Sequence, residues 1–166
     1  MRELMIDHTV VNDDTACYII AEIGHNHQGS LEQAKELFRV AKECGVNAVK
    51  LQKRDNRRLY TEAQYNKVYD SKNSFGKTYG EHREKLEFGD GEYAYLKSYA
   101  VELGLTMFAT PFDFASVDFL EKHDMPVYKI ASGDICNIPL IRYIAEAGKP
   151  MIISTGGALL EDVKRA

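Results

Sequence analysis

Five times along this chain of 166 residues, a short apolar run is followed by a polar turn and an amphipathic stretch. The apolar runs lie at residues 18–21, 46–51, 105–109, 127–131 and 151–153. Apolar strands that alternate with helices are typical of parallel sheets, in which helices cover the strands and bury both faces. The alternation therefore predicts an α/β fold.

The spacing of the runs distinguishes two kinds of α/β fold. The last three runs begin roughly 22–24 residues apart, and such compact crossover units favour a (β/α) barrel over an open Rossmann sheet. No glycine-rich GxGxxG segment follows the first run, which weakens the dinucleotide-binding alternative. A complete barrel has eight strands and about 250 residues. We expect a (β/α)8 TIM-barrel type fold of which residues 1–166 hold only about the first five βα units, the amino-terminal part of the barrel domain.

Helix signals fill the intervals between the apolar runs. Ser30 opens the first predicted helix, Gln33 is its expected capping-box partner, and Gly45 ends it. Asn137 is the expected N-cap of a later helix that has a proline in its first turn. Other helices are predicted at 90–104, around 117–120 and at the end of the chain.

Composition and charge are those of an ordinary globular protein. Hydrophobic residues make up 45% of the chain and charged residues 28%, a balance that argues against disorder. The net charge of −4 argues against a nucleic-acid surface, because binding phosphates needs clustered excess Lys and Arg. No apolar run approaches the ~18 residues of a membrane helix, and the first residues do not resemble a signal peptide. We therefore expect a cytoplasmic protein with neither a nucleic-acid nor a membrane partner.

Cysteine and histidine positions give weaker signals. Cys17, Cys44 and Cys136 share no short-spaced motif and are expected to be reduced, mostly buried thiols. His25 and His27 alternate with an asparagine, so they are either a metal-binding pair or residues that stabilise a turn. Without a third ligand at a suitable spacing, the turn is the favoured interpretation.

Residues 53–89 form a long segment without clear periodicity, and a structureless loop of that length usually covers a site. Its basic residues are expected to be solvated. Its aromatic residues either cover a substrate or pack on the surface. The basic residues are Lys53, Arg54, Arg57 and Arg58, and the aromatic ones are Tyr60, Tyr65, Tyr69, Phe75 and Tyr79.

Polar residues collect where the predicted strands end, which is the edge where barrel enzymes place their catalytic groups. Two of them, Lys50 and Lys129, lie within or beside apolar runs, where a lysine is costly unless it meets an anion. Two lysines and several hydroxyls on one rim suit a phosphate or carboxylate. The rim residues are Glu22, Lys50, Gln52, Thr110, Asp113, Lys129, Ser132, Asp134, Ser154 and Thr155.

Glu22 ends the first predicted strand. At that place it is either a general acid or base or a salt-bridge partner for one of the lysines.

Taken as strings, these residues resemble the sialic acid synthase family. Six motifs occur in the family's order and together cover nearly the whole chain. They are AEIGHNHQG at 21–29, VKLQ at 49–52, ATPFD at 109–113, YKIASGD at 128–134, NIPLI at 137–141 and ISTGG at 153–157. The string NSFGKTYGEHREKLEF at 73–88 is also similar to members of the family.

The resemblance implies a reaction and a set of site residues. Phosphoenolpyruvate would condense with the open-chain aldehyde of N-acetylmannosamine or a related N-acetylated hexosamine, giving a nine-carbon 2-keto sugar acid and phosphate. Glu22 matches the catalytic glutamate. The residues that match phosphoenolpyruvate-binding positions are Lys50, Thr110, Lys129, Ser132 and Ser154. The residues that match positions facing the sugar are Gln52, Asn73, Tyr79 and Asp134, the last standing where the family commonly has glutamate.

The resemblance also implies components that this chain does not supply. A divalent metal, Mn²⁺ or Mg²⁺, would polarise the aldehyde oxygen, held by histidines on barrel strands six and seven. The complete protein would be a homodimer, in which a further domain reaches the partner's sugar site. We therefore expect the 166-residue chain to be inactive alone.

Two other interpretations of the sequence stay open. One is a Schiff-base aldolase that uses Lys50 or Lys129 on the same barrel rim. The other is a non-catalytic, truncated module that binds a sugar phosphate or a partner protein.

Overall fold

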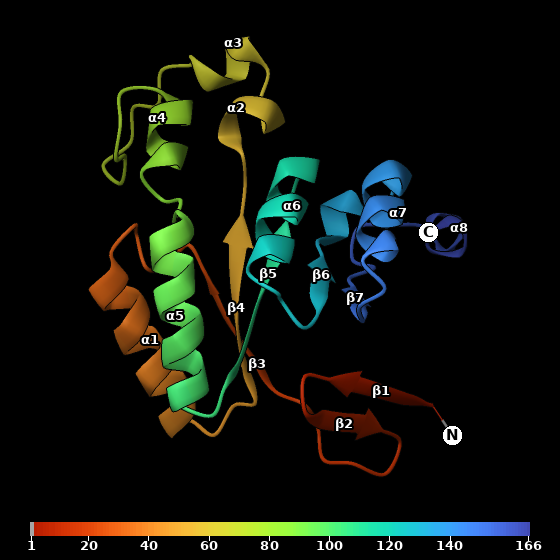
Figure 1. Cartoon of the computed structure of the whole chain (residues 1–166). Coiled ribbons are helices and arrows are strands. Elements are labelled where there is room, and N and C mark those ends of the chain that lie inside the picture. The colour runs from red at the N-terminus through yellow and green to blue at the C-terminus, as the bar shows by residue number, and fades with distance from the viewer. Residues whose placement is uncertain (1) are drawn as a thin grey trace.

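The computed structural model describes residues 2–166 and contains a five-stranded parallel sheet with a small hairpin at one end (Figure 1). The strands of the sheet are β3 (Ile20–Gly24), β4 (Ala48–Lys53), β5 (Thr106–Pro111), β6 (Tyr128–Ile130) and β7 (Met151–Ile153). Each strand pairs with the next one along the chain, in the order β3-β4-β5-β6-β7. An open doubly wound sheet would reverse its order at a switch point, whereas a barrel wall does not. The expected α/β fold of TIM-barrel type is confirmed.

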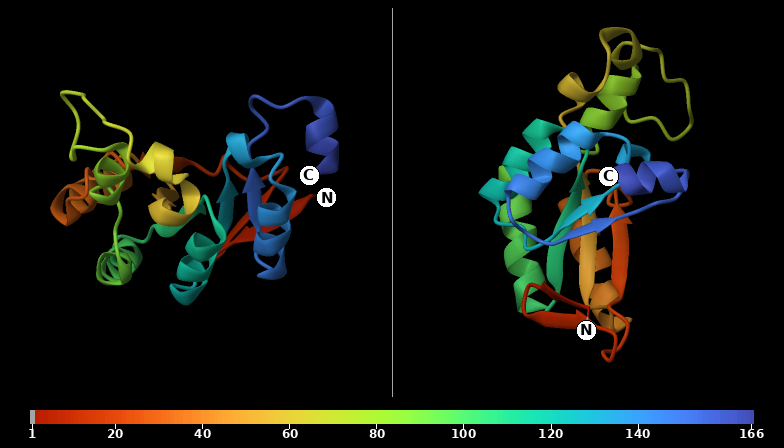
Figure 2. Two further views of the ribbon diagram at one scale, coloured as in Figure 1. Left: turned by 90° about the horizontal axis from the view of Figure 1, so that it is seen from above. Right: turned by 90° about the vertical axis from the view of Figure 1, so that its right-hand side faces the viewer.

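Helices connect the strands and bury the apolar side of the sheet. They are α1 (Leu31–Glu43), α5 (Asp90–Glu102), α6 (Phe114–Lys122) and α7 (Ile138–Glu146), and α8 (Leu160–Arg165) follows the last strand. Figure 2 shows α1, α5, α6 and α7 along one side of the curved sheet. Phe38, Leu96, Leu120 and Ile144 project from these four helices, and none of them is exposed to solvent. Their burial is the main apolar contribution to this layer.

Two helix starts follow the predicted capping chemistry. The Ser30 side chain accepts a hydrogen bond from the Gln33 backbone N–H, and Asn137 caps α7 with Pro139 in the first turn. The expected capping box is wrong in one half. The Gln33 side-chain amide donates to the Asn26 carbonyl at 2.8 Å, which joins α1 to the turn after β3.

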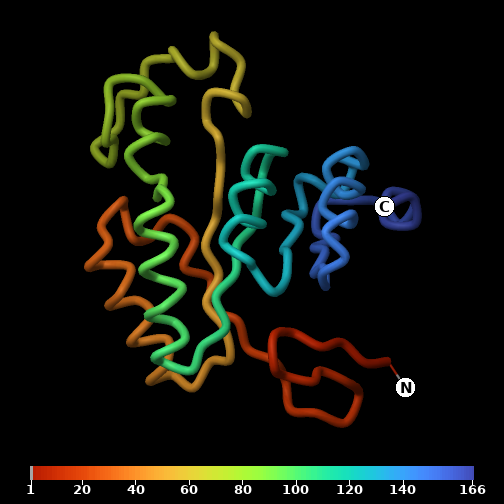
Figure 3. Tube along the Cα trace, in the orientation of Figure 1, coloured from red at the N-terminus to blue at the C-terminus, as the bar shows by residue number. Residues whose placement is uncertain are grey.

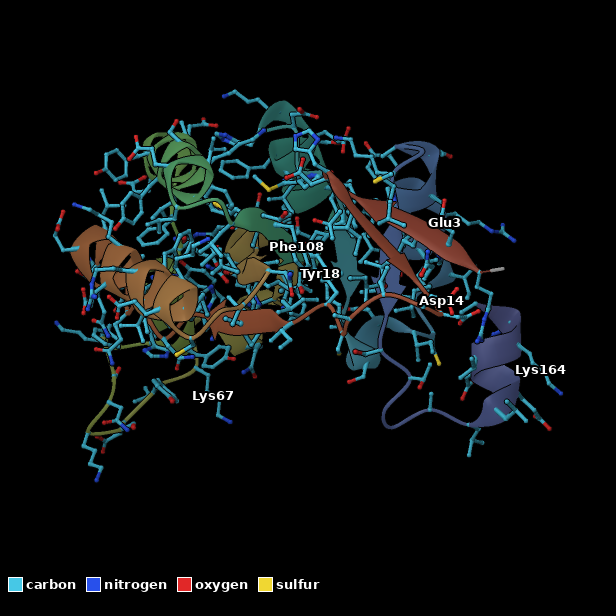
Figure 4. The ribbon with its side chains drawn as sticks, turned by 90° about the horizontal axis from the view of Figure 1, so that it is seen from below. Glu3, Asp14, Tyr18, Lys67, Phe108 and Lys164 are labelled. Atoms are coloured by element: carbon cyan, nitrogen blue, oxygen red, sulfur yellow. The ribbon has the colours of Figure 1, made fainter. Side chains whose placement is uncertain are left out.

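The sequence did not predict the amino-terminal hairpin, formed by β1 (Glu3–Ile6) and β2 (Thr9–Asn12). It lies at the amino-terminal end of the strands, away from the predicted rim (Figure 1). Ile6 is 2% exposed, and the Thr106 hydroxyl at the start of β5 donates to Asp7 at 3.2 Å. Viewed from that end, Phe108 lies in the interior of the molecule, whereas Glu3 lies on the hairpin (Figure 4). The hairpin thus covers the lower end of the sheet.

The segment between β4 and α5 extends beyond the carboxyl ends of the strands (Figure 3). It contains three short helices, α2 (Asn56–Leu59), α3 (Glu62–Tyr65) and α4 (Tyr79–Glu84), so the expectation of a structureless loop is wrong. Asp55, Thr61 and Thr78 each cap one of them through a side-chain oxygen. Four to six residues are too few to show a helical period, which is why the apolar pattern did not predict them.

Two other findings concern the surface. Cys17, Cys44 and Cys136 are all exposed, so the expectation of mostly buried thiols is wrong. Each follows or precedes an element rather than lying within it, where burial of the thiol is not required. Within residues 2–166, no helix is both long and apolar enough to cross a membrane.

Candidate active site

The carboxyl ends of the first three parallel strands bring Glu22, Lys50 and Thr110 together. Glu22 and Lys50 are paired in register across β3 and β4, and their side chains form an ion pair. The Lys50 ammonium also donates to the Thr110 hydroxyl at 3.0 Å. Lys50 is 6% exposed and Thr110 is 2% exposed, whereas about half of the Glu22 side chain is accessible. The predicted salt bridge between Glu22 and one of the lysines is therefore present, and the Glu22 side chain remains partly accessible.

Lys129 forms the second cationic centre of the rim. Its ammonium donates to the Ser154 hydroxyl and to the Ile130 carbonyl, both at 2.6 Å. Burial lowers the pKa of Lys129, the nearby charge of Lys50 lowers it further, and Glu22 acts in the opposite direction. Lys50 pairs with Glu22, whereas the hydrogen-bond partners of Lys129 within residues 2–166 are a hydroxyl and a carbonyl, which leaves an excess of positive charge that favours an anion.

Gln52 faces the same side of β4 as Lys50, two residues further along the strand. A side chain at Gly24 would lie 3.3 Å from both the Gln52 amide nitrogen and a Glu22 oxygen, and Gly24 has a φ of +55°. Glycine at this position thus allows Glu22 and Gln52 to approach each other over the β3 bulge. The structure brings these two predicted site residues together.

Ser132 and Asp134 lie in a single 3₁₀ turn after β6, from Ser132 to Asp134. The Ser132 side chain faces Gly156 in the loop after β7, so two predicted motifs meet there. Burial raises the pKa of Asp134, while the Asn137 side chain and the charge of Arg54 lower it. Asp134 is therefore a partly desolvated carboxylate at the rim.

Asn73 and Tyr79 lie in the segment beyond the strand ends. Tyr79 packs edge-to-face on Tyr60 and Tyr69, with ring centroids 5.2 and 5.6 Å apart. Asn73 is exposed, and its backbone N–H donates to the Ser71 hydroxyl at 3.3 Å. Within residues 2–166, no hydrogen bond or ion pair joins Asn73 or Tyr79 to the lysines of the rim. Their assignment to the sugar remains a prediction.

Asp113 and Thr155 are the remaining two residues of the predicted rim. Asp113 is a structural cap: its carboxylate accepts from the Ser116 backbone N–H and hydroxyl and from the Asp55 backbone N–H. Thr155 is exposed in the loop after β7. Asp113 therefore connects α6 to the start of α2, and both of its carboxylate oxygens accept hydrogen bonds there.

A buried charged cluster beneath the long segment was not predicted. Glu87 is its only carboxylate, and its oxygens lie 3.2 Å from the His25 Nε2 and 3.5 Å from the Lys53 ammonium. Arg83 donates to the His25 Nδ1 at 3.1 Å, and Arg54 donates its backbone N–H to Glu87. The expected solvation of Lys53 and Arg54 is therefore wrong. The missed signal was Arg54 itself, because Lys50, Gln52 and Arg54 recur with the period of one strand face.

The two histidines of the first motif stabilise the turn after β3. His27 is 2% exposed, stacks on Phe88 with centroids 4.0 Å apart, and accepts the Gly29 N–H at its Nδ1. Burial lowers the pKa of both His25 and His27, that of His27 to about 4. In the described part of the chain, no three His, Cys, Asp or Glu residues are grouped so that they could hold a metal ion. The turn interpretation is confirmed for His27, whose ring accepts a hydrogen bond within the turn, whereas the His25 ring contacts Arg83 and Glu87.

Sequence comparisons give consistent relatives. The NeuB family matches residues 37–166. The N-acetylneuraminate-9-phosphate synthase of Mus musculus is 42% identical over 149 residues, covering 90% of this chain and 42% of the relative. The N,N′-diacetyllegionaminic acid synthase of Legionella pneumophila is 39% identical over 154 residues, covering 90% of this chain and 42% of the relative. The chain thus spans less than half the length of these relatives.

Structure comparisons agree. The sialic acid synthetase from Leptospira borgpetersenii superposes with a TM-score of 0.82 at 28% identity, covering 99% of this chain and 53% of that chain. A truncated 3-deoxy-D-arabino-heptulosonate 7-phosphate synthase from Thermotoga maritima superposes with a TM-score of 0.64 at 12% identity, covering 98% of this chain and 48% of that chain. The second similarity concerns the fold alone.

Proposed function

Because the chain belongs to the NeuB family, we propose that it forms the phosphoenolpyruvate-binding part of a synthase that makes nine-carbon 2-keto sugar acids. The resemblance to sialic acid synthases is confirmed by the relatives, which are named as synthases of N-acetylneuraminate 9-phosphate and of a legionaminic acid. The proposed substrates are phosphoenolpyruvate and an N-acetylmannosamine-type aldehyde sugar. The proposed products are the sugar acid and phosphate.

The observation that carries this proposal is the pair of lysines with their hydroxyl partners. Lys50 with Thr110, and Lys129 with Ser154, place two ammonium groups at one end of the sheet. Phosphoenolpyruvate carries a carboxylate and a phosphate, so it offers one strong anionic group to each lysine. Its negative charge would offset burial and the charge of Lys50, which both lower the pKa of Lys129.

Glu22 is proposed to act at the reacting carbons. The C2–C3 π electrons of phosphoenolpyruvate form the new bond to the aldehyde carbon, whose oxygen takes up a proton. Positive charge then develops at C2, where a carboxylate stabilises it. Water adds at C2 and loses one proton, which leaves a hydroxyl on C2. Phosphate then leaves with its bridging oxygen, and the hydroxyl gives up its proton to the departing phosphate to form the 2-keto acid. Glu22 is suited to accept the proton of that water because half of its side chain is accessible.

The residues of this chain do not by themselves fit the divalent metal that the resemblance implies. Glu22 already pairs with Lys50, and residues 2–166 contain no group of three potential ligands. The ligands of such a metal would lie outside these residues. No step above is assigned to it.

The complete protein that carries this chain allows a direct test of the lysine assignment. Lys129→Ala should weaken phosphoenolpyruvate binding by roughly 2–5 kcal/mol, because the substrate anion loses a partly buried cation. Phosphate release with phosphoenolpyruvate, N-acetylmannosamine and Mn²⁺ gives the Michaelis constants. Lys122→Ala is the matched control, because Lys122 is exposed on α6 and pairs with Asp90. An unchanged Michaelis constant for phosphoenolpyruvate in Lys129→Ala would contradict the assignment.

A Schiff-base aldolase is the second candidate, favoured by the lowered pKa of Lys129. A less basic lysine is more often neutral and therefore more nucleophilic toward a carbonyl. Incubation with pyruvate and borohydride separates the two functions. An aldolase would be trapped as a covalent adduct on Lys129, whereas a synthase that condenses phosphoenolpyruvate with a sugar forms no imine and would keep its mass.

A further inference from the structure

Glu87 lies between α4 and α5, at the point where the long segment returns to the sheet. One of its carboxylate oxygens accepts the Arg54 backbone N–H at 3.2 Å and lies 3.5 Å from the Lys53 ammonium. The same ammonium donates to the Phe88 carbonyl at 2.7 Å. The two ends of the long segment are therefore joined at its base, beside the carboxyl end of β4.

His25 connects the same carboxylate to the turn after β3. Its Nε2 lies 3.2 Å from the other Glu87 oxygen, and its Nδ1 accepts from Arg83 at 3.1 Å. Burial lowers the pKa of His25, which favours the neutral ring. Because an arginine can only donate, the proton of that neutral ring is on Nε2, the nitrogen that faces Glu87. Glu87 thus orients the imidazole, and the imidazole holds the last turn of α4.

The Glu87 carboxylate is charged although only 8% of its side chain is exposed. Burial alone would raise its pKa, but His25, Lys53 and the Arg54 N–H together hold that pKa below its usual value. Removal of the carboxylate would leave the Lys53 ammonium, which is 12% exposed, without its ionic partner and the Arg54 N–H unpaired. The base of the long segment should therefore loosen when Glu87 is lost.

The predicted sugar-facing residues, Asn73 and Tyr79, belong to the returning arm of the long segment, residues 73–88. This arm packs against the outgoing one, because the Tyr79 N–H donates to the Lys67 carbonyl at 2.8 Å and the Tyr79 ring packs on Tyr60. The body of the segment is thus held together by its own contacts. Its place over the strand ends depends on how its base is fixed.

The lysines proposed to bind phosphoenolpyruvate are held by other contacts. Glu22 and Thr110 hold Lys50, and Ser154 holds Lys129. These side chains come from strands or from the loop directly after β7, and none of them belongs to the long segment. A change at Glu87 should therefore affect the acceptor sugar and leave phosphoenolpyruvate binding unchanged.

We infer that Glu87 is a positioning residue for the acceptor sugar, which holds the returning arm with Asn73 and Tyr79 over the carboxyl ends of the strands. The inference rests on the proposed function, in which these two side chains face the sugar. Glu87 touches neither substrate and acts through its contacts with His25 and Lys53.

Steady-state phosphate release by the complete protein with phosphoenolpyruvate, N-acetylmannosamine and Mn²⁺ tests this role. Glu87→Ala should raise the Michaelis constant for N-acetylmannosamine about tenfold or more, because the sugar-facing side chains are displaced. The Michaelis constant for phosphoenolpyruvate should stay within about twofold. Glu87→Gln keeps an acceptor for the Arg54 N–H and should have an intermediate effect. An equal rise for both substrates, or no rise, would overturn the inference.

Glu84→Ala is the matched control. Glu84 is also a glutamate of the returning arm, but it is exposed and accepts from the Tyr65 hydroxyl within the segment. Both Michaelis constants should be unchanged in this variant. His25→Ala combined with Glu87→Ala should raise the Michaelis constant for N-acetylmannosamine no further than Glu87→Ala alone, because the two residues act through one contact. Multiplied effects would overturn positioning through His25.

Hydrogen exchange of the complete protein examines the same contacts without turnover. In Glu87→Ala, the amides of residues 79–86 should exchange about tenfold faster than in the wild type, whereas those of β5 should be unchanged. Unchanged exchange at 79–86 would overturn the role of Glu87. Absence of condensation by the wild type would instead contradict the proposed function, and the exchange rates would still decide whether Glu87 holds the returning arm.

Discussion

Glu22 forms an ion pair with Lys50 and is also proposed to act on the substrate. Its partly exposed side chain is compatible with both roles. One carboxylate oxygen pairs with Lys50, and about half of the Glu22 side chain is accessible to solvent. A residue that only neutralised Lys50 would be better buried with it, because solvent weakens an ion pair. The arrangement instead leaves a carboxylate beside the position of the proposed C2 carbon.

Glu22→Gln tests that role in the complete protein. The amide can still accept a hydrogen bond from Lys50, so phosphoenolpyruvate and sugar binding should persist. Turnover should fall by on the order of 10²-fold or more, because the amide neither takes the proton of water nor stabilises positive charge. Steady-state measurement of phosphate release gives kcat and the Michaelis constants of both substrates. Near-normal turnover would return Glu22 to a purely structural ion pair.

His27 predicts how stability depends on pH. Its imidazole is buried against Phe88, and burial lowers its pKa from 6.5 to about 4. Above pH 6.5 the ring is neutral in both the folded and the unfolded chain, so its titration does not change the free energy of unfolding. As the pH falls from 6.5 toward 4, the unfolded chain binds a proton that the folded chain excludes, and the free energy of unfolding falls by about 2–3 kcal/mol.

Urea unfolding between pH 4 and 7 measures this dependence. His27→Asn retains an acceptor for the Gly29 N–H but removes the titration, so its curve should be flatter than that of the wild type. His25→Asn is the companion variant, because the pKa of His25 is lowered in the same direction. Parallel curves for His27→Asn and wild type would contradict the assignment.

At the scale of elements, the turn after β3 is joined closely to the end of the long segment. Gly29 has a φ of +76°, and a side-chain carbon there would lie 2.1 Å from the Lys85 carbonyl oxygen. The neighbouring contacts of His25 with Glu87 and of His27 with Phe88 join the same two pieces of chain. This junction sets where the predicted sugar-facing residues of the segment stand relative to the strands.

Two glycines with the same backbone conformation separate strain from steric contact. Gly45 also has a φ of +76°, but a side chain there would meet no atom within 4 Å. Gly45→Ala should therefore cost only the 1–2 kcal/mol of a left-handed residue. Gly29→Ala should cost a further 1–3 kcal/mol or more, because the Lys85 backbone must move. Thermal unfolding compares them, and equal losses would show that the junction is loose.

Which elements the sequence predicts depends on how they are stabilised. The five strands and four main helices bury continuous or periodic apolar residues, so β7, for example, was predicted at its observed bounds of Met151–Ile153. The hairpin and the helices α2, α3 and α4 depend on caps and long-range contacts that no apolar period reveals. Lys50 and Thr110 were predictable because they are polar residues within or directly after apolar runs. The contact of Lys53 with Glu87 was not, because it joins residues from opposite ends of the long segment.

At the scale of the whole molecule, the parallel sheet separates stability from chemistry. All strand carboxyl ends lie on the same edge, where Lys50, Thr110 and Lys129 collect. The amino-terminal edge is covered by the hairpin through Asp7 and Thr106. Barrel enzymes use the first edge for catalysis and the second for stability.

Two threonines of β5 test this division, because Thr106 and Thr110 lie four residues apart on the same face of one strand and are both buried. Thr106→Val removes the hydrogen bond to Asp7 and should lower the free energy of unfolding by about 1–2 kcal/mol, with unchanged Michaelis constants. Thr110→Val removes the acceptor of the Lys50 ammonium and should raise the Michaelis constant for phosphoenolpyruvate about tenfold. Urea unfolding and steady-state kinetics of the complete protein measure both effects. A comparable rise of the Michaelis constant in Thr106→Val would show that the two ends of the sheet are coupled, contrary to the division proposed here.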